Sequence, residues 1–424
     1  MDTIFALATA PGRAGVSVIR VSGPVAVEIA SGLMDEVPQS RGLRVLRDAA
    51  GETIDQALVL TFQSGHSFTG EEVVELQTHG SPAVVKAVSL RLYDLGARQA
   101  EAGEFTRRAL DNGQLDLSQV EGLADLIDAE TEMQRKQAVR VFTGGMSELV
   151  EQWRRKMIRA AALVEATIDF ADEEVPTDVS PEVTDLLAGV RAELEREIAG
   201  ASVAERLRNG FEVAIIGAPN AGKSTLLNRL AGRDAAITSE VAGTTRDVIE
   251  VNFDLRGIPV TFLDTAGIRE TQDSVERLGV QRALDRSRQA DMRVVLKFDD
   301  DGMDEEIGPT DLVYLAQADR FGEIENAVSG KTGYGVDALI GDIHSRLSGR
   351  MRLNSTATRE RHMIAMSRSI DGIDAAFLYM ESEGSEDLVA ENIRSAIRAI
   401  EALIGRVDVE SLLDEIFSSF CIGK

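Results

Sequence analysis

The stretch "GAPNAGKST", residues 217–225, fits the pattern G-x-x-x-x-G-K-[ST], which binds nucleoside triphosphates. Gly217 and Gly222 let the backbone wrap closely, so that its N–H groups face phosphate oxygens. Lys223 can reach the terminal phosphates, and Ser224 offers a hydroxyl to Mg²⁺. An apolar strand precedes the stretch and an amphipathic helix follows it, which is the context that this motif requires. The expected phosphate-binding residues are Asn220, Ala221, Gly222, Lys223, Ser224 and Thr225.

Two further segments carry groups suited to a metal ion and a terminal phosphate. "VTFLDTAG" is a strand ending in "DTAG", where an aspartate can hold a metal-bound water and a glycine N–H can bind a γ-phosphate. Before it lies "SEVAGTTRD", in which Thr245 could supply a second Mg²⁺ hydroxyl. In this order after a phosphate loop, they indicate a GTPase switch apparatus. The residues are Ser239, Glu240, Val241, Ala242, Gly243, Thr244, Thr245, Asp264, Thr265, Ala266 and Gly267.

Base recognition follows a reduced pattern. GTPases usually carry N-K-x-D after the fifth strand, whereas this chain has "AQAD", in which only Asp319 matches. Its carboxylate would accept hydrogen bonds from guanine N1 and N2. "AVSGKTG" resembles the last GTPase loop, with Ser329, Gly330 and Lys331. We expect guanine to be bound with weakened affinity, because the asparagine and lysine contacts are missing.

The groups that would assist hydrolysis are not fixed by spacing. Ras-like proteins place a water-orienting glutamine just after "DTAG", and this chain has the apolar Ile268 there. Glu270, Asp273 and Glu276 lie shortly downstream, and each could replace it. Asn220 could help to hold a monovalent cation that neutralises charge developing on the phosphates.

The surrounding elements predict an inserted domain. Residues 1–117 combine strands such as "GVSVIRVSG" and "DQALVLTF" with the helix "SPAVVKAVSLRLYDLGA", which is an α+β pattern. Residues 118–208 are helical, with an interruption at "TGG", and residues 349–424 are helical again. Between them, 209–348 alternate strands and helices. We expect the two helical parts to pack together, because neither alone can bury its apolar stripe.

Composition restricts the remaining functions. The net charge of the 424 residues is −26, so bulk electrostatics disfavours coating of nucleic acid. The single cysteine, Cys421, cannot form an internal disulfide, which fits a cytoplasmic location. The four histidines show no metal-ligand spacing. No apolar run approaches about 18 residues, and the start has no basic leader, so we expect neither a membrane span nor a signal peptide.

Taken as a set, the motifs resemble the MnmE (TrmE) family of bacterial tRNA modification GTPases. The resemblance covers the whole chain and is carried by "GAPNAGKST", "AGTTRD", "DTAGIRE", "VERLG", "PGRAGVSVIRVSG", "GEFTRRALDNGQLDLSQVEGLADLIDA" and the ending "FCIGK". It implies an N-terminal α+β folate-binding and dimerisation domain over 1–117. It also implies a helical domain, 118–208 with 349–424, that carries an inserted Ras-like P-loop GTPase domain over 209–348.

The resemblance also implies an activity and its partners. It implies a K⁺-stimulated GTPase that acts as a homodimer and as a heterotetramer with the FAD-dependent protein MnmG. Such a complex adds a carboxymethylaminomethyl or aminomethyl group to C5 of the wobble uridine of certain tRNAs. The implied cofactors are GTP/GDP, Mg²⁺, K⁺ and a one-carbon folate, either 5-formyltetrahydrofolate or methylenetetrahydrofolate. Because the chain is acidic, we expect contact with tRNA to be shared with the partner.

Residues that match the family's motifs take on its roles. Glu276 matches the catalytic glutamate, and Cys421 is the cysteine of the tail, which we expect to support tRNA modification but not GTP hydrolysis. Ser224 and Thr245 match the Mg²⁺ ligands; Asn220, Ser239, Val241 and Thr244 match the K⁺ site. The implied folate-binding positions are Arg20, Glu75, Gln114 and Lys424, and Gln114 stands where a lysine is common.

Two other functions account for part of the sequence. One is a regulatory GTPase that associates with ribosomes, which would have no need of a folate-like domain or of the tail. The other is a nucleotide-binding scaffold that does not turn over GTP. Binding of a formylated folate tests the first, and hydrolysis in KCl against NaCl tests the second.

Overall fold

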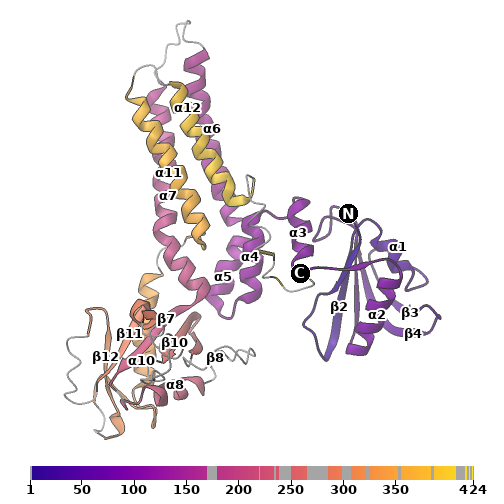
Figure 1. Cartoon of the computed structure of the whole chain (residues 1–424), viewed down its shortest axis with the longest axis horizontal. Helices are drawn as coiled ribbons and strands as arrows, with labels where there is room; N and C mark the ends of the chain where they lie inside the picture. Colours follow the sequence, from indigo (N-terminus) through magenta and orange to yellow (C-terminus); the bar gives the residue numbers. More distant parts are fainter. Residues whose placement is uncertain are drawn as a thin grey trace, which may run out of the picture. The chain divides into compact units, whose positions relative to one another are not determined.

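A computed structural model describes most of the chain: residues 2–169, 179–218, 220–233, 235–237, 250–264, 285–297, 307–320, 324–351, 355–382, 386–406, 416–417, 420 and 423. Two compact units are formed, one by residues 1–124 with 401–424 and the other by residues 125–400 (Figure 1). The predicted domain boundaries at residues 117, 208 and 348 stay predictions.

The first unit is built on a six-stranded sheet with the order β3-β4-β5-β2-β1-β6. Neighbouring strands are antiparallel except β1 and β6, which are parallel. The predicted strands at "GVSVIRVSG" and "DQALVLTF" are confirmed as β2 and β4. The strands are β1 (Ile4–Leu7), β2 (Ala14–Ser22), β3 (Arg41–Arg47), β4 (Thr53–Phe62), β5 (Val73–Gly80) and β6 (Arg98–Gln99).

One face of this sheet carries the main core. Ile19 and Val21 of β2 alternate with outward residues, as expected for a strand that is buried on one side. They pack with Ile29 of α1 (Ala26–Ser31) and Leu92 of α2 (Pro82–Asp94). The second helix confirms the helix predicted over "SPAVVKAVSLRLYDLGA".

The opposite face is only partly covered. Phe105 of α3 (Glu104–Asp111) packs with Ile4 and Ala6 of β1, and Phe68 joins this small cluster. Farther along the same face, Leu43 and Leu58 stand directly opposite each other on β3 and β4. Leu43 is 64% exposed and Leu58 is 36% exposed, so an apolar part of this face is open in a single chain.

A buried arginine joins three segments of this unit. Arg108 on α3 is only 5% exposed. It forms ion pairs with Asp2 at 2.8 Å, with Glu104 at 3.0 Å and with Glu71 at 3.1 Å. Arg98 forms a further pair with Asp2, at 2.7 Å, and its hydrogen bond lowers the pKa of Asp2 to about 2. The N-terminus is thereby held against α3 by charged groups that have partners, as burial requires.

The second unit contains a long helical bundle. The helices are α5 (Glu132–Phe142), α6 (Gly145–Asp169), α7 (Ser180–Asn209), α11 (Glu360–Met380) and α12 (Glu386–Glu401). The break between α5 and α6 falls at the predicted "TGG". Arg191 of α7 pairs with Asp374 of α11 at 2.6 Å, and Arg394 of α12 pairs with Glu165 of α6 at 3.0 Å. Helices from before and after the α/β segment therefore pack together, as the sequence predicts.

The α/β segment of this unit forms a seven-stranded sheet with the order β13-β12-β11-β7-β10-β9-β8. The strands from β13 to β10 in this order run parallel, whereas β9 and β8 are antiparallel to their neighbours. Helices α8 (Lys223–Ala231) and α10 (Val336–Arg350) bury Leu226, Leu230, Leu339 and Ile343 in its core. The strands are β7 (Phe211–Gly217), β8 (Ala236–Ile237), β9 (Glu250–Leu255), β10 (Ile258–Asp264), β11 (Met292–Lys297), β12 (Leu312–Ala316) and β13 (Ala327–Val328).

This architecture agrees with the predicted fold class: a multidomain chain with an α+β N-terminal part, a helical part and an α/β part of P-loop type. Among the helices in the described part of the chain, none is long and apolar enough to cross a membrane.

Candidate functional site

The motifs converge on one edge of the seven-stranded sheet. In open α/β sheets, ligands bind at the carboxyl ends of the parallel strands. Strand β7 ends at Gly217, and Asp264 closes β10 one strand away, paired in register with Ile215. Gln317 follows the end of β12, and Ser329 follows the end of β13. The carboxyl ends of four strands, β7, β10, β12 and β13, therefore lie at this edge.

The phosphate loop has the tight backbone that its glycines predict. A β-carbon on Gly217 would lie 2.5 Å from the carbonyl oxygen of Leu296, so this close approach excludes any side chain. Gly222, the N-cap residue just before α8, has a φ of +92° in the left-handed region, where glycine is favoured. The loop leads directly into the N-terminus of α8, whose free N–H groups and dipole attract anions.

Lys223 is folded back onto this loop. Its side chain is buried, with 6% exposed, and its Nζ donates to the carbonyl oxygens of Gly217 at 2.6 Å and Ala218 at 2.9 Å. The ammonium group is thus held within the loop that would surround a phosphate. Phosphate oxygens would be stronger acceptors than these carbonyls because they are charged.

A second group of residues forms the base-recognition side. Asp319 lies on a short 3₁₀ helix, Ala318–Arg320, and accepts a 2.7 Å hydrogen bond from the hydroxyl of Ser329. That bond lowers the pKa of Asp319 below its ordinary value, so the carboxylate is an acceptor at neutral pH. A β-carbon on Gly330 would lie 2.5 Å from the backbone nitrogen of Leu226, so this loop packs directly on the start of α8.

Arg229 of α8 also contacts the loop that carries Gly330. Its guanidinium donates to the carbonyl oxygens of Gly330 at 3.1 Å and Lys331 at 2.6 Å. The structure therefore brings Asp319, Ser329, Gly330 and Lys331 beside the helix that carries Lys223 and Ser224. This proximity is what a nucleotide site requires, because one ligand must reach both its phosphate and its base contacts.

One contact at this edge is not apparent from the sequence. Gln317, which occupies the lysine position of N-K-x-D, donates through its side-chain amide to the backbone oxygen of Asn220 at 2.6 Å. Comparison of the sequence with the usual motif shows only that Gln317 replaces the lysine. No local signal indicates this bond, because the two residues are 97 positions apart.

Several predicted residues lie outside the described part of the chain. They are Ser239, Glu240, Val241, Ala242, Gly243, Thr244, Thr245, Thr265, Ala266, Gly267, Glu276, Cys421 and Lys424. Asp264 is described only as the end of β10. Of the predicted metal ligands, Ser224 and Asn220 are described, and they offer a hydroxyl and an amide oxygen, which suit hard cations. Among the residues that the structure describes, no group of three or more His, Cys, Asp or Glu side chains could hold a metal ion.

Two of the predicted folate-binding residues form a pair in the first unit. Arg20 of β2 and Glu75 of β5 stand directly opposite each other, and their side chains form a salt bridge at 2.9 Å. The Arg20 guanidinium lies over the rings of Phe68 at 5.4 Å and Phe105 at 5.6 Å. Such a partly buried, oriented pair can present both hydrogen-bond donors and acceptors to a planar heterocycle.

Gln114 lies beside the turn that carries Phe68. A β-carbon on Gly70 would be 3.1 Å from Cγ of Gln114, and the side chain of Asn112 donates to the backbone oxygen of Thr69 at 2.7 Å. The segment after α3 is therefore fastened to this turn, near the Arg20–Glu75 pair.

The end of the chain reaches the same sheet. Phe417 and Phe420 pack with Val120, and their ring centroids are 5.9 Å apart. Beyond them, Gly423 has a φ of +103°, and a β-carbon there would collide with the carbonyl oxygen of Leu7 and lie 3.3 Å from Cα of Ala8. Leu7 ends β1, the strand in which Ala6 is paired with Arg20. Gly423 therefore lies against the strand next to Arg20.

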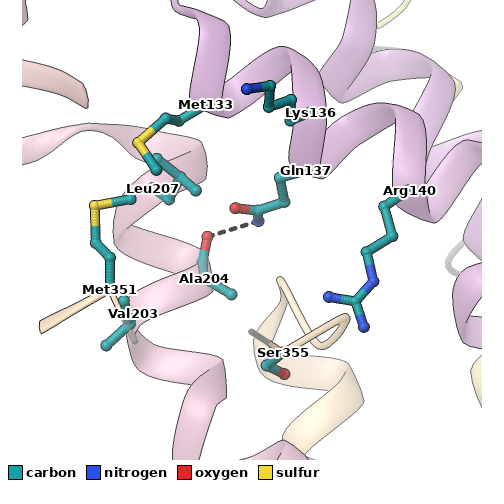
Figure 2. Close-up of a pocket in the computed structure, with 9 residues that line it drawn as sticks. All are labelled: Met133, Lys136, Gln137, Arg140, Val203, Ala204, Leu207, Met351 and Ser355. Atoms are coloured by element: carbon teal, nitrogen blue, oxygen red, sulfur yellow. Dashed lines mark hydrogen bonds between the residues drawn. The ribbon is translucent and has the colours of Figure 1, made fainter. Parts of the chain in front are cut away.

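A separate cavity of about 270 Å³ lies in the second unit where α5, the end of α7 and the segment after α10 meet (Figure 2). Figure 2 shows Met133, Lys136 and Arg140 along α5 and Met351 from the segment after α10. Gln137 of α5 donates a 2.8 Å hydrogen bond to the backbone oxygen of Ala204. None of the predicted site residues lines it. The lining residues are Met133, Lys136, Gln137, Arg140, Val203, Ala204, Leu207, Met351 and Ser355.

Comparison with known proteins identifies the family. The chain matches the family described as "GTP-binding protein TrmE N-terminus" over residues 3–114 and "MnmE helical domain" over residues 117–421. It is 58% identical to the tRNA modification GTPase MnmE of Roseobacter denitrificans over 428 residues, and 60% identical to that of Ruegeria pomeroyi over 429 residues. Each alignment covers 100% of both chains.

A partial likeness to a solved structure, Era from Aquifex aeolicus, has 29% identity, covers 32% of this chain and 56% of that chain, and has a TM-score of 0.26. The family assignment rests instead on the two full-length relatives and on the family match, which spans most of the chain. The chain belongs to the MnmE (TrmE) family of tRNA modification GTPases.

Proposed function

We propose that this chain hydrolyses GTP to GDP and phosphate, and that hydrolysis drives a tRNA modification carried out with an FAD-dependent partner. The proposed product carries a carboxymethylaminomethyl or aminomethyl group on C5 of the wobble uridine, with its carbon supplied by a tetrahydrofolate. One observation carries the GTPase part: the phosphate loop and the Ser329–Asp319 pair lie at the same edge of one sheet.

In the nucleotide site, the chain's own groups would bind and orient GTP. Lys223 and the backbone N–H groups of residues 220–224 would hold the phosphates, while Asp319 would accept hydrogen bonds from guanine N1 and N2. Ser224 with Thr245 would hold Mg²⁺, which neutralises charge on the phosphates. Asn220, with Ser239, Val241 and Thr244, would hold K⁺. Glu276 would position the attacking water through other groups.

The first unit would bind the folate. The Arg20–Glu75 pair offers donors and acceptors to a pterin, and Gln114 and Lys424 complete the proposed set. The contact of Gly423 with Leu7 supports this proposal, because it carries the chain end toward the same strands. Cys421 would act there, either by organising the site or as a nucleophile, for which a thiolate is well suited.

The open sheet face around Leu43 and Leu58 supports the proposed homodimer. Exposed, paired leucines on a face that also carries Arg20 and Glu75 are suited to contact with a second copy. The heterotetramer with MnmG would supply much of the contact with tRNA, because a net charge of −26 repels a phosphate backbone. All of these steps would take place in the cytoplasm.

The test separates the two activities in one protein. Cys421→Ser should keep K⁺-stimulated GTP hydrolysis at the parental rate, while wobble-uridine modification, measured by mass spectrometry of digested tRNA, is abolished or sharply reduced. Binding of a formylated folate is measured in parallel. A protein that hydrolyses GTP but neither binds folate nor supports modification would instead fit a ribosome-associated GTPase.

A further inference from the structure

We propose that Gln317 is a positioning residue, which fixes the phosphate loop through the backbone of Asn220. This inference rests on the proposed nucleotide site. It adds a residue that lies in the base-recognition loop but affects phosphate binding, because it contacts the phosphate loop. Gln317 would thereby offset part of the affinity lost with the missing asparagine and lysine.

The bond joins two loops that come from different strands. Asn220 lies midway along the phosphate loop, three residues after Gly217 and three before Lys223. Its backbone oxygen accepts from the Gln317 side-chain amide at 2.6 Å, a short distance for an N–H···O hydrogen bond. Gln317 follows β12 directly, so the bond connects the middle of the loop to the end of the strand that lies between β13 and β11.

The backbone at both ends of the bond supports a specific role. Gln317 has a φ of +57° and Asn220 a φ of +67°, which place two residues other than glycine in the left-handed region. Asparagine tolerates this conformation, whereas a long side chain such as glutamine rarely adopts it. At residue 317 this conformation accompanies a side chain that reaches the phosphate loop, and the hydrogen bond offsets its cost.

One end of the bond is anchored in the core. The neighbours of Gln317, Ala316 and Ala318, are 1% and 3% exposed, and Ala316 is paired in register with Val328 of β13. Arg320 donates its backbone N–H to the Gln317 carbonyl oxygen at 2.9 Å. Asn220 is exposed. The bond therefore holds the phosphate loop against the end of the sheet. The N–H groups of this loop then already point toward the phosphate site before the ligand binds, which reduces the cost of ordering them.

This role makes a distinctive prediction about ligands. If Gln317 acts through the phosphate loop, its loss weakens every ligand that uses this loop, whatever the base. If Gln317 instead contacts the base, its loss weakens guanine nucleotides alone. Asp319 is the natural comparison, because its proposed contacts are to guanine only.

The experiment measures dissociation constants of the full chain for GDP, ADP and inorganic tripolyphosphate, by displacement of a fluorescent GDP analogue. Gln317→Ala should weaken all three by a similar factor, about five- to tenfold, the size expected for one hydrogen bond. Gln317→Lys should keep parental binding of tripolyphosphate, because its ammonium can donate to the same carbonyl oxygen. Asp319→Ala should weaken GDP much more than tripolyphosphate.

A second variant separates the hydrogen bond from backbone strain. Gln317→Gly adopts a positive φ freely but has no amide, so it should bind as weakly as Gln317→Ala. Parental affinity in Gln317→Gly, or a loss confined to GDP in either variant, would overturn the proposal. Thermal unfolding of each variant verifies that the domain is folded. A parental chain that binds none of the three ligands would refute the nucleotide site itself, which is a different result.

Discussion

The hydroxyl of Ser329 donates to a carboxylate oxygen of Asp319 at 2.7 Å, joining the loop after β13 to the loop after β12. Ser329 is only 1% exposed, so its hydroxyl is fixed in place, whereas Asp319 is exposed. The bond orients the carboxylate and keeps its pKa low. Asp319 is thus presented as an ionised acceptor, which is the complement of the two adjacent donors on guanine.

Changing that acceptor should change the base that is bound. Asp319→Asn replaces one acceptor with an amide donor, so it should oppose guanine N2 but complement xanthine, which has an oxygen at that position. We expect GDP affinity to fall roughly 10- to 100-fold, the range for a hydrogen bond to a charged group, while affinity for xanthosine diphosphate rises. Dissociation constants for both nucleotides test this. If both affinities fell together, Asp319 would not be the base-reading residue.

The parts of the site that could be predicted from the sequence are those formed by residues that are close together in the chain. The phosphate loop needs two glycines, a lysine and a serine at fixed spacing, and the local chain alone dictates its shape. The pairing of Arg20 with Glu75 depends instead on the register between β2 and β5, which no local pattern specifies. The Gln317–Asn220 bond depends on the packing of two loops and on unusual backbone angles.

The fold was predictable for the same reason. Periodicity in "GVSVIRVSG" and in "SPAVVKAVSLRLYDLGA" indicated elements that β2 and α2 confirm. By contrast, no pattern in the sequence predicted that Arg108 is buried. An arginine on a short helix is usually exposed, and only the convergence of Asp2, Glu71 and Glu104 explains its burial.

Glu276 lies outside the described residues, and its role can be tested by kinetics. Glu276→Ala should slow GTP hydrolysis by roughly 100-fold or more, because the water loses its orienting group, while GDP affinity stays unchanged. Single-turnover hydrolysis with saturating enzyme separates the chemical step from binding. Glu270→Ala and Asp273→Ala serve as controls. Parental turnover in Glu276→Ala would return attention to those two residues.

The proposed K⁺ site predicts a cation effect that depends on Asn220. Hydrolysis by the parental protein should be faster in K⁺ than in Na⁺, because the smaller ion fits a K⁺-sized cage poorly. Asn220→Gly is the informative variant, since it removes the amide while tolerating the φ of +67°. Its rates in the two salts should become similar, with GDP affinity retained. Equal rates in both salts for the parental protein would argue against the site.

The charged cluster around Asp2 predicts an acid response in the first unit. Its folded pKa is about 2, against an ordinary value of 3.8, so its contribution is fully present above about pH 4 and is lost as the pH falls toward 2. Arg98→Gln should reduce that dependence, because the hydrogen bond from Arg98 is the main cause of the shift. Hydrogen exchange of residues 2–111 between pH 2 and 5 measures it. Arg135→Gln, on α5 of the other unit, should have no effect there.

The contact between Gly423 and Leu7 predicts a role for a residue that carries no side chain. Leu7 is paired in register with Ile19 of β2, and this pairing restrains its carbonyl oxygen against an added β-carbon at Gly423. Gly423→Ala must therefore displace the chain end, and with it the neighbouring Cys421 and Lys424. We expect tRNA modification and folate affinity both to fall sharply, with K⁺-stimulated GTP hydrolysis unchanged. Cys421→Ser should differ, losing modification but keeping folate affinity if the thiol acts chemically.

Gly96→Ala is the matched control for this variant. Gly96 has a φ of +97°, close to the +103° of Gly423, but nothing lies within 4 Å of its missing β-carbon. Both alanine variants therefore share the backbone strain of a positive φ, and only Gly423→Ala adds a collision. Folate affinity by calorimetry and wobble-uridine content of tRNA should be parental in Gly96→Ala and low in Gly423→Ala. Equal folate affinity and equal tRNA modification in the two variants would mean that the contact of Gly423 with β1 is not required for the modification.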